Sequence, residues 1–306
     1  MSTAVETFSR QLPNGTTLSC RATGAAGQDR PLMLFVHGFP EAAFVWDALM
    51  QHFAQPEHGG FRCLAPNLRG FEHSSAPREV ADYRPHLLMQ DLRQLVASER
   101  PDGQIHTLVA HDWGGALAWG VANAWPDQVA RLVSINSPHP ATFARELAHN
   151  PEQQAASAYM HWLAKPGSEA LLAENDFARL IAMLGDSAGP DGQPWLTESV
   201  KAQYRAVWRQ GLTGACNLYR VTPMKPPLPG QPVNLPELPP ERVRVDVPTL
   251  VIWGTEDRAL RPGLLDGLDA HVPRLTVQRV PGASHWIVHE QPQQVAQAIA
   301  AFQART

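Results

Sequence analysis

The stretch His111-Asp112-Trp113-Gly114-Gly115 decides how the centre of this chain folds. A short apolar run, Thr107-Leu108-Val109-Ala110, precedes it, and an Ala- and Trp-rich segment of helical character follows it. We therefore expect a strand, a sharp turn and a helix, with Asp112 at the apex of the turn. Such a tight turn needs small neighbours so that the backbone can fold past itself, and Ala110 and Gly114 meet that need.

The apex residue is a carboxylate, and this determines which chemistry the turn supports. A carboxylate that attacks carbon forms an alkyl ester on the protein. Its natural targets are strained ethers and alkyl halides rather than esters. It needs hydrogen-bond donors that hold it, a base that activates water to break the ester, and a group that stabilises the leaving atom.

Apolar strands alternate with helices on both sides of this turn, which indicates a mostly parallel sheet covered by helices on both faces. The expected strands are Thr17–Ala22, Pro31–Val36, Phe61–Ala65, Thr107–Ala110, Arg131–Ile135, a run that begins at Val247, and Leu275–Val280. The expected helices of this part are His86–Arg100, the segment after the turn, and Gln291–Arg305.

The alternation disappears in the middle of the chain. Helical stretches are expected there at Glu152–Leu163, Ser168–Leu184 and Thr197–Gly211. The proline-rich run from Pro223 to Pro240 cannot belong to a helix or a central strand. We predict an α/β core from residues 1–138 and 246–306, with residues 139–245 inserted as a helical cap that ends in an extended return connection.

Composition excludes several functions. The net charge of −4 and the absence of a basic stripe argue against nucleic acid as a partner. No apolar run is long enough for a membrane span. The cysteines Cys20, Cys63 and Cys216 are scattered and odd in number, which favours a reducing, cytoplasmic location over a disulfide framework.

The hydrogen-bond donors for Asp112 are expected from a second turn. The strand Pro31–Val36 runs into His37-Gly38-Phe39-Pro40, and the backbone N–H groups of Phe39 and Trp113 are candidate oxyanion donors. The Phe39–Pro40 peptide bond is a candidate for the cis form. An ordinary strand-to-loop turn is the alternative interpretation of this segment.

The base and its partner are expected near the C-terminus. His285 follows the last strand, at the carboxyl edge of the sheet where open α/β sheets place their sites. Asp257 follows the preceding strand and is our choice for the acid that orients His285, with Glu256 as its competitor. His111 is interpreted as structural. The i,i+4 pair of His285 and His289 lacks a third ligand nearby, so no metal is expected.

The leaving group distinguishes the two possible reactions. Opening an epoxide produces an alkoxide that needs an acid, and a phenol with a pKa of about 10 stays protonated at neutral pH and can donate. Tyr159 and Tyr219 lie in the predicted cap, where they could point down at Asp112. Tyr204 also lies in the cap and is the rival candidate.

Together these residues resemble the epoxide hydrolases of the α/β-hydrolase fold. The motifs that carry the resemblance are HGFP at 37–40, HDWGG at 111–115, GTEDRAL at 254–260, GASHW at 282–286, and NLYR at 217–220. Tyr159, which lies eight residues before Gly167, matches the first cap tyrosine of that family. Leu218 replaces a tryptophan that is usual in the family, and Ala110 replaces a common glycine. The resemblance extends from about Phe8 to Ala304.

The resemblance implies that Asp112 is the nucleophile, His285 the base and Asp257 the orienting acid. It implies that Tyr159 and Tyr219 bind the epoxide oxygen. We expect an apolar epoxide and water as substrates, a vicinal diol as product, no cofactor, and a monomer or homodimer. The residues that we expect to line the substrate pocket are His37, Pro40, Trp162 and Trp286, together with Trp113.

Two other functions remain open from the sequence. A haloalkane or haloacid dehalogenase also uses an aspartate nucleophile, but the paired cap tyrosines and Phe39 favour an epoxide. A non-catalytic scaffold that binds a ligand is the third alternative, because a fold by itself does not establish catalysis.

Overall fold

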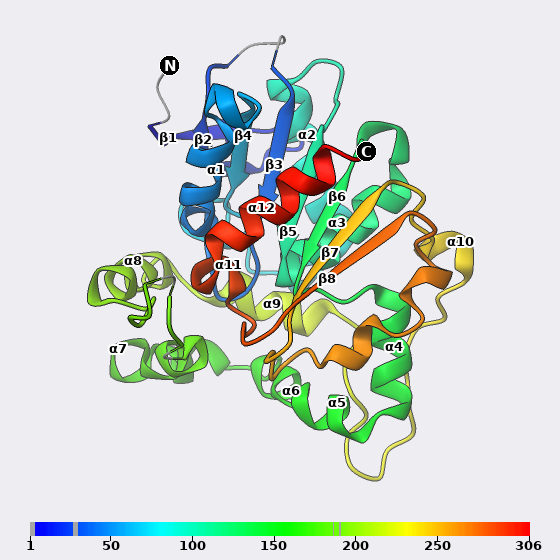
Figure 1. The fold of residues 1–306 in the computed structure, drawn as a ribbon. Helices are drawn as coiled ribbons and strands as arrows, with labels where there is room; N and C mark the ends of the chain where they lie inside the picture. Colours follow the sequence, from blue (N-terminus) through cyan, green and yellow to red (C-terminus); the bar gives the residue numbers. More distant parts are fainter. Residues whose placement is uncertain (1–3, 27–29, 186, 190) are drawn as a thin grey trace.

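An eight-stranded sheet crosses the centre of the protein, with helices on both faces (Figure 1). The computed structural model describes residues 4–26, 30–185, 187–189 and 191–306. The strand order is β1-β2-β4-β3-β5-β6-β7-β8. The strands are β1 (Glu6–Gln11), β2 (Thr17–Thr23), β3 (Leu32–Val36), β4 (Arg62–Pro66), β5 (Thr107–His111), β6 (Leu132–Ile135), β7 (Thr249–Gly254) and β8 (Leu275–Val280).

The sheet is parallel from β4 to β8, as the sequence predicts. In this sheet, β1 pairs antiparallel with β2 and β2 with β4, and the other neighbouring strands pair parallel. Every residue of β3, β5, β6 and β7 is buried. Helices cover both faces of these strands, and this explains why their sequences are nearly continuous apolar runs rather than alternating ones.

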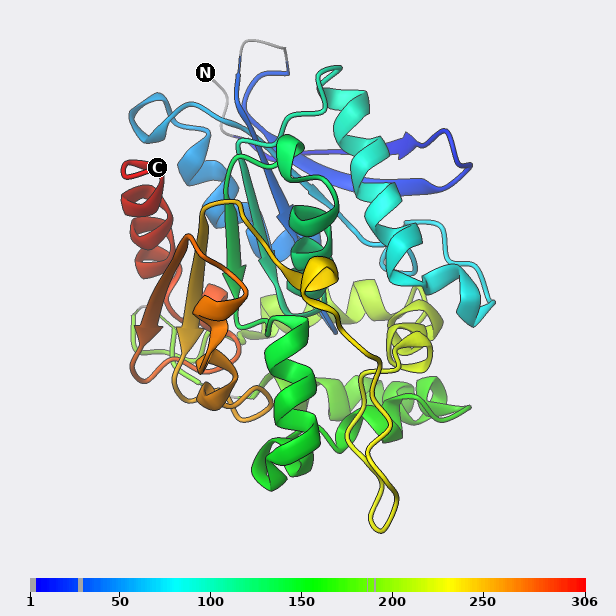
Figure 2. The ribbon, with the colours of Figure 1, turned by 90° about the vertical axis from the view of Figure 1, so that its right-hand side faces the viewer.

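Two pairs of helices cover the sheet. α1 (Asp47–Phe53) and α12 (Pro292–Gln303) pack on one face, and α2 (Pro85–Glu99) and α3 (Asp112–Ala124) pack on the other. The view in Figure 2 shows these two layers edge-on. α11 (Ile287–Glu290) leads into α12, and α10 (Pro240–Val243) contacts α3.

A group of helices is inserted between β6 and β7 and lies beyond the carboxyl ends of the parallel strands (Figure 1). They are α4 (Pro140–His149), α5 (Pro151–Ala156), α6 (Tyr159–Leu163), α7 (Ser168–Leu184), α8 (Glu198–Trp208) and α9 (Thr213–Val221). The predicted α/β fold with an inserted helical cap is therefore confirmed. The predicted boundaries, after residues 138 and 245, lie in the connections between β6 and α4 and between α10 and β7.

The cap differs from the sequence prediction in detail. The helix expected at Glu152–Leu163 is two helices, α5 and α6. The helix α7 has the expected bounds, but it is interrupted from Glu174 to Phe177, where three consecutive residues have positive φ. Asn and Asp tolerate this conformation better than most residues, and Asp176 is held by Arg205 of α8.

The return connection from Pro223 to Pro239 contains no helix or strand, as its prolines predict, and it forms the long loop that extends downward in Figure 2. The strand β1 and the helices α1, α4 and α9 were not expected from the sequence. Cys20, Cys63 and Cys216 are buried free thiols. Across the described ranges, no helix is both long enough and apolar enough to cross a bilayer.

Candidate active site

Asp112 lies at the sharp turn between β5 and α3. Its φ of 50° is in the left-handed region, which a non-glycine residue adopts only when the surrounding structure holds it there. A Cβ atom on Gly38 would lie 2.3 Å from Oδ1 of Asp112, and one on Gly114 would lie 2.2 Å from the carbonyl oxygen of Val36. Both positions therefore need glycine, because the turn at Asp112 and the turn after β3 touch each other.

The β3 turn supplies a hydrogen bond to the carboxylate. The backbone N–H of Phe39 donates to Oδ1 of Asp112 at 2.7 Å, and the Phe39–Pro40 bond is cis. Trp113, the other expected donor, follows in the first turn of α3. Ser137 Oγ donates to the backbone carbonyl oxygen of Asp112 at 2.7 Å and fixes the turn from the β6 side.

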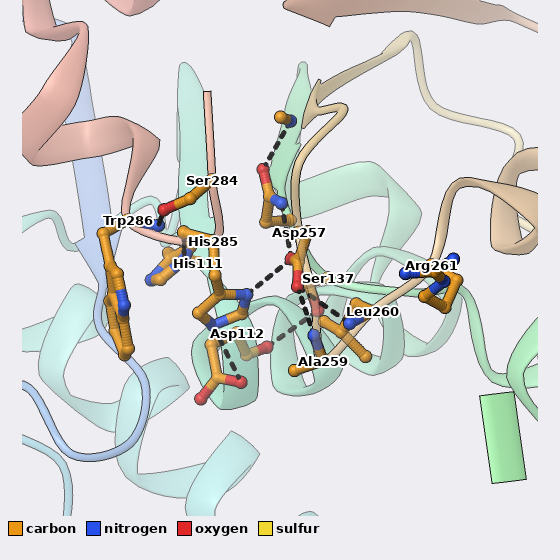
Figure 3. A network of polar contacts seen from close by, with 12 residues as sticks. His111, Asp112, Ser137, Asp257, Ala259, Leu260, Arg261, Ser284, His285 and Trp286 are labelled. Carbon is orange, nitrogen blue, oxygen red and sulfur yellow. Dashed lines mark hydrogen bonds and ion pairs between the residues drawn. The ribbon is translucent and has the colours of Figure 1, made fainter. Parts of the chain in front are cut away.

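His285 and Asp257 meet Asp112 at the same edge of the sheet (Figure 3). Nδ1 of His285 lies 2.6 Å from Oδ2 of Asp257, and Nε2 lies 3.6 Å from Oδ2 of Asp112. The order carboxylate, imidazole, carboxylate is thus present in space, although the three residues come from three separate loops. Glu256, the alternative acid, is exposed, whereas Asp257 is only 1% exposed.

Asp257 is surrounded by donors. The backbone N–H groups of Ala259 and Leu260 donate to its Oδ1 at 2.9 and 2.8 Å. Asn136 Nδ2 donates to its Oδ2 at 2.6 Å, beside the bond to His285. With both oxygens doubly occupied, the carboxylate is stabilised in its ionised form and in one orientation.

The pKa values of the pair follow from these contacts. Burial alone would raise the pKa of Asp257, but the charge and hydrogen bond of His285 and the remaining donors bring it below its ordinary value. Burial alone would lower the pKa of His285, but the charge of Asp257 and the contacts with Asp112 raise it well above its ordinary value. Part of that rise thus depends on Asp112 being an anion.

The two predicted phenols meet in the cap above Asp112. Tyr159 begins α6 and Tyr219 belongs to α9, and their ring centroids are 5.9 Å apart. The ring of Tyr219 packs edge-on against Phe39 at 5.0 Å and against Trp113 at 5.2 Å. Burial, with nearby negative charge, raises the pKa of both phenols, so both remain protonated donors at neutral pH.

Two cavities meet at these residues. The larger has a volume of about 630 Å³ and the smaller about 260 Å³, and Asp112, Tyr159 and Tyr219 line both of them. His285 and Trp286 line only the larger cavity. The smaller cavity is mainly apolar and includes Trp113, Phe143, Met160, Met224 and Leu260 in its wall.

Three residues expected in the pocket lie outside the walls of both cavities. His37 is fully buried, and its ring nitrogens bond the Gly38 carbonyl and the Leu68 N–H, so it supports the β3 turn from behind. The carbonyl of Pro40 accepts a hydrogen bond from the cap, and Trp162 packs against the core cluster. His37 and Pro40 are neighbours of Phe39 in the turn after β3, and Trp162 is a neighbour of Tyr159 in α6, but nearness in sequence does not place these three side chains in the cavity walls.

The structure also contains a polar cluster that sequence reasoning missed. The carboxylate of Glu41 is buried and contacts His111 Nδ1 at 2.8 Å, His289 Nε2 at 2.9 Å and the hydroxyl of Tyr204 at 3.2 Å. Tyr204, the rival candidate for the leaving-group acid, is thus engaged away from Asp112. His111 Nε2 bonds the carbonyl of His285, which agrees with its structural interpretation.

No group of three His, Cys, Asp or Glu side chains within the described ranges has the arrangement of a metal site. His289, the partner considered for His285, faces Glu41 and stacks on Trp195 instead, with ring centroids 4.1 Å apart.

The geometry agrees with the comparisons to known proteins. The profile of the family described as "alpha/beta hydrolase fold" matches residues 31–292, and the chain belongs to that family. Several of its relatives are named epoxide hydrolases, as the sequence motifs indicate. Epoxide hydrolase 3 of Xenopus tropicalis is 33% identical over 91% of this chain and 73% of its own length. The AB hydrolase superfamily protein YfhM of Bacillus subtilis is 33% identical over 94% of both chains.

Solved structures give the same assignment. An epoxide hydrolase from metagenomes of hot environments superposes with a TM-score of 0.84 at 36% identity, covering 97% of this chain and 98% of its own. The epoxide hydrolase of Bacillus megaterium, solved with an inhibitor, has a TM-score of 0.81 at 30% identity, covering 97% of this chain and all of its own. The chain therefore lies among the epoxide hydrolases of the α/β-hydrolase family.

Proposed function

We propose that this protein hydrolyses an apolar epoxide to a vicinal diol through a covalent ester on Asp112. The observation that carries the proposal is the pair of buried phenols, Tyr159 and Tyr219, in the wall of the same cavities as Asp112. A carboxylate nucleophile alone is equally suited to an alkyl halide. Two protonated phenols opposite it suit a leaving oxygen that must acquire a proton.

In the first step, Oδ2 of Asp112 attacks an epoxide carbon. The N–H of Phe39 occupies Oδ1, which leaves Oδ2 as the free oxygen on the His285 side. As the C–O bond of the ring breaks, the oxygen takes a proton from Tyr159 or Tyr219, and the phenol is reprotonated later in the cycle. Asp112 then carries a neutral alkyl ester, and Oδ1 is its carbonyl oxygen.

In the second step, His285 removes a proton from water, and the hydroxide attacks the ester carbonyl carbon. The N–H groups of Phe39 and Trp113 stabilise the oxyanion on Oδ1. When this intermediate collapses, the alkoxide leaves and takes the proton that His285 removed from water, which completes the diol. The carboxylic acid left on Asp112 gives up its proton, and this proton restores the tyrosinate to a phenol. The first step prepares the second. Ester formation removes the negative charge of Asp112, so the pKa of His285 falls and the imidazole becomes available as a base.

A single-turnover experiment in ¹⁸O-labelled water tests this route. We expect the label to appear in Asp112 after one turnover and in the diol after several, because water attacks the ester carbonyl. The variant His285→Gln should gain the mass of one epoxide and keep it. An unlabelled Asp112, or a variant whose mass does not change, contradicts the covalent route. Halide release from haloalkanes without diol from any epoxide assigns the site to dehalogenation instead.

The remaining parts of the proposal concern cofactors, the cap, the location of the protein and its assembly. We propose that it needs neither a metal nor an organic cofactor, since every step has a side chain or a backbone N–H to carry it. We further propose that residues 139–245 act as the cap that supplies the phenols, and that the protein works in the cytoplasm as a monomer or homodimer.

A further inference from the structure

The cap helix α8 contacts the core at the turn that presents the Phe39 N–H. The indole Nε1–H of Trp208 donates to the carbonyl oxygen of Pro40 at 2.7 Å. The hydroxyl of Tyr204, one turn earlier on the helix, donates to Oε1 of Glu41 at 3.2 Å. Pro40 and Glu41 directly follow Phe39, the proposed oxyanion donor. The hydrogen bonds from α8 therefore lie within two residues of the backbone N–H that bonds Asp112.

We infer that α8 positions the oxyanion donor for ester hydrolysis, with Trp208 and Tyr204 as positioning residues that hold the turn from Gly38 to Glu41. The inference rests on the proposed function. It gives the cap a second role, separate from the phenols of α6 and α9 that act on the epoxide oxygen.

The hydrogen bonds from Trp208 and Tyr204 are buried, and they hold the turn from Gly38 to Glu41 in one position. Trp208 is 3% exposed and Tyr204 is fully buried, so bulk water does not freely replace either donor. Without Tyr204, Glu41 Oε1 still keeps its contact with His289 Nε2, which explains why a smaller effect is expected there. The two aromatic rings stack on each other with centroids 5.3 Å apart, which limits the movement of both donors. An oxyanion donor is effective only when it is held at hydrogen-bond distance from the developing charge.

A chain of contacts also connects Glu41 with His285, the proposed base. Glu41 Oε1 also contacts His289, and Glu41 Oε2 contacts His111 Nδ1 at 2.8 Å. His111 Nε2 in turn contacts the carbonyl oxygen of His285 at 2.9 Å. The ring of His111 thus connects the Glu41 carboxylate to the backbone of His285, the proposed base.

A displaced Phe39 N–H should affect the two steps of the reaction differently. The Phe39 N–H stabilises Oδ1 of Asp112 most when that oxygen carries the full charge of the tetrahedral intermediate, which forms only in ester hydrolysis. In ring opening the negative charge leaves Asp112, so a weaker donor does not slow the attack and even makes the carboxylate more reactive. A displaced donor therefore slows the second step and spares the first.

The experiment compares Trp208→Phe and Tyr204→Phe with Trp46→Phe. Trp46 is fully buried, and its indole nitrogen finds no hydrogen-bond acceptor among the residues that the structure describes. The control thus removes the same ring atoms from the core without removing a hydrogen bond. Styrene oxide and a set of alkyl epoxides are mixed with excess enzyme, and rapid quenching with intact-mass analysis follows ester formation and decay separately.

We expect ester decay about ten- to a hundredfold slower in Trp208→Phe, a smaller effect in Tyr204→Phe, and ester formation unchanged or faster in both. The ester should then accumulate during turnover. Equal decay rates in wild type and in both variants overturn the inference. The inference is also overturned if the rates of ester formation and ester decay fall by the same factor, and if Trp46→Phe shows the same fall. Such a result indicates general destabilisation of the protein.

Three further outcomes are distinguished by design. If Trp208→Phe does not fold, Tyr204→Phe, which loses a single oxygen atom, decides the question by the same ratio of rates. If the wild-type protein forms no ester with any epoxide, both the proposed function and this inference fail. If the wild type forms and hydrolyses the ester while the variants match it, only the inference fails.

Discussion

Replacing Asp257 with Asn tests the proposed catalytic triad at the atom where the structure constrains it most. Four donors point at this carboxylate, two on each oxygen. An amide has one oxygen and one NH₂ group. If the amide oxygen keeps the two backbone donors of Ala259 and Leu260, the NH₂ group faces Nδ1 of His285 and the amide of Asn136.

The substitution then reverses the tautomer of His285. Nδ1 must accept a hydrogen bond from the new amide, so the proton moves to Nε2, the nitrogen that faces Asp112 and must take a proton from water. The same substitution in the Ser-His-Asp triad of serine proteases lowers kcat about 10⁴-fold. We expect ester hydrolysis about 10³- to 10⁴-fold slower here, equivalent to about 4 to 5.5 kcal/mol of activation free energy.

The assay is single-turnover ester formation and decay, read by intact mass. Asp257→Asn should form the ester at a rate within about tenfold of wild type and hold it, because the first step does not use His285 as a base. In Glu256→Gln, at the neighbouring exposed position, the ester should decay at nearly the wild-type rate. Decay in Asp257→Asn within tenfold of wild type, or an equal loss in Glu256→Gln, refutes this assignment of the acid.

Three further predictions follow from the site. Tyr159→Phe and Tyr219→Phe should each slow ester formation about 10²-fold without slowing ester decay, measured in the same assay; wild-type formation in the double variant contradicts their role as acids. In Asp112→Asn the pKa of His285 should fall, since the carboxylate that raises it becomes neutral, and an NMR titration of the imidazole that shows no fall contradicts the proposed link between the two steps. Gly38→Ala should abolish ester formation, because the new Cβ lies 2.3 Å from Oδ1 of Asp112, while circular dichroism still shows a folded protein.

The sequence predicts those parts of the fold that depend on neighbouring residues in the chain, such as strands and tight turns. The sequence predicts the bounds of the buried strands to within a residue or two, because strands covered on both faces are short apolar runs between turns. The turn at Asp112 was recognised because close backbone packing requires small residues at fixed offsets. The positions of His285 and Asp257 follow from the same logic, since loops after parallel strands meet at one edge of the sheet.

The remaining parts depend on contacts between distant segments. The cluster around Glu41 combines residues from the β3 turn, the end of β5, α8 and α11, and no spacing in the sequence connects these four segments. The break inside α7 carries no proline or glycine, and its arginine contact comes from α8. The sequence does not single out Asn136, because a single Asn after a strand forms no pattern, although its amide donates to Asp257, the proposed triad acid.

The positions of the tyrosines show why the choice of reaction could not come from the core alone. The turn at Asp112 carries the proposed nucleophile, and the loops at Asp257 and His285 carry the proposed base and its acid, but these groups are equally suited to releasing a halide or opening an epoxide. What differs is the group opposite Asp112, and that group comes from the inserted cap, where Tyr159 and Tyr219 line both cavities. If α8 also holds the oxyanion turn, exchanging the cap for one from a dehalogenase would change the substrate and impair ester hydrolysis together. Exchanging only α6 and α9 would change the substrate and leave hydrolysis intact.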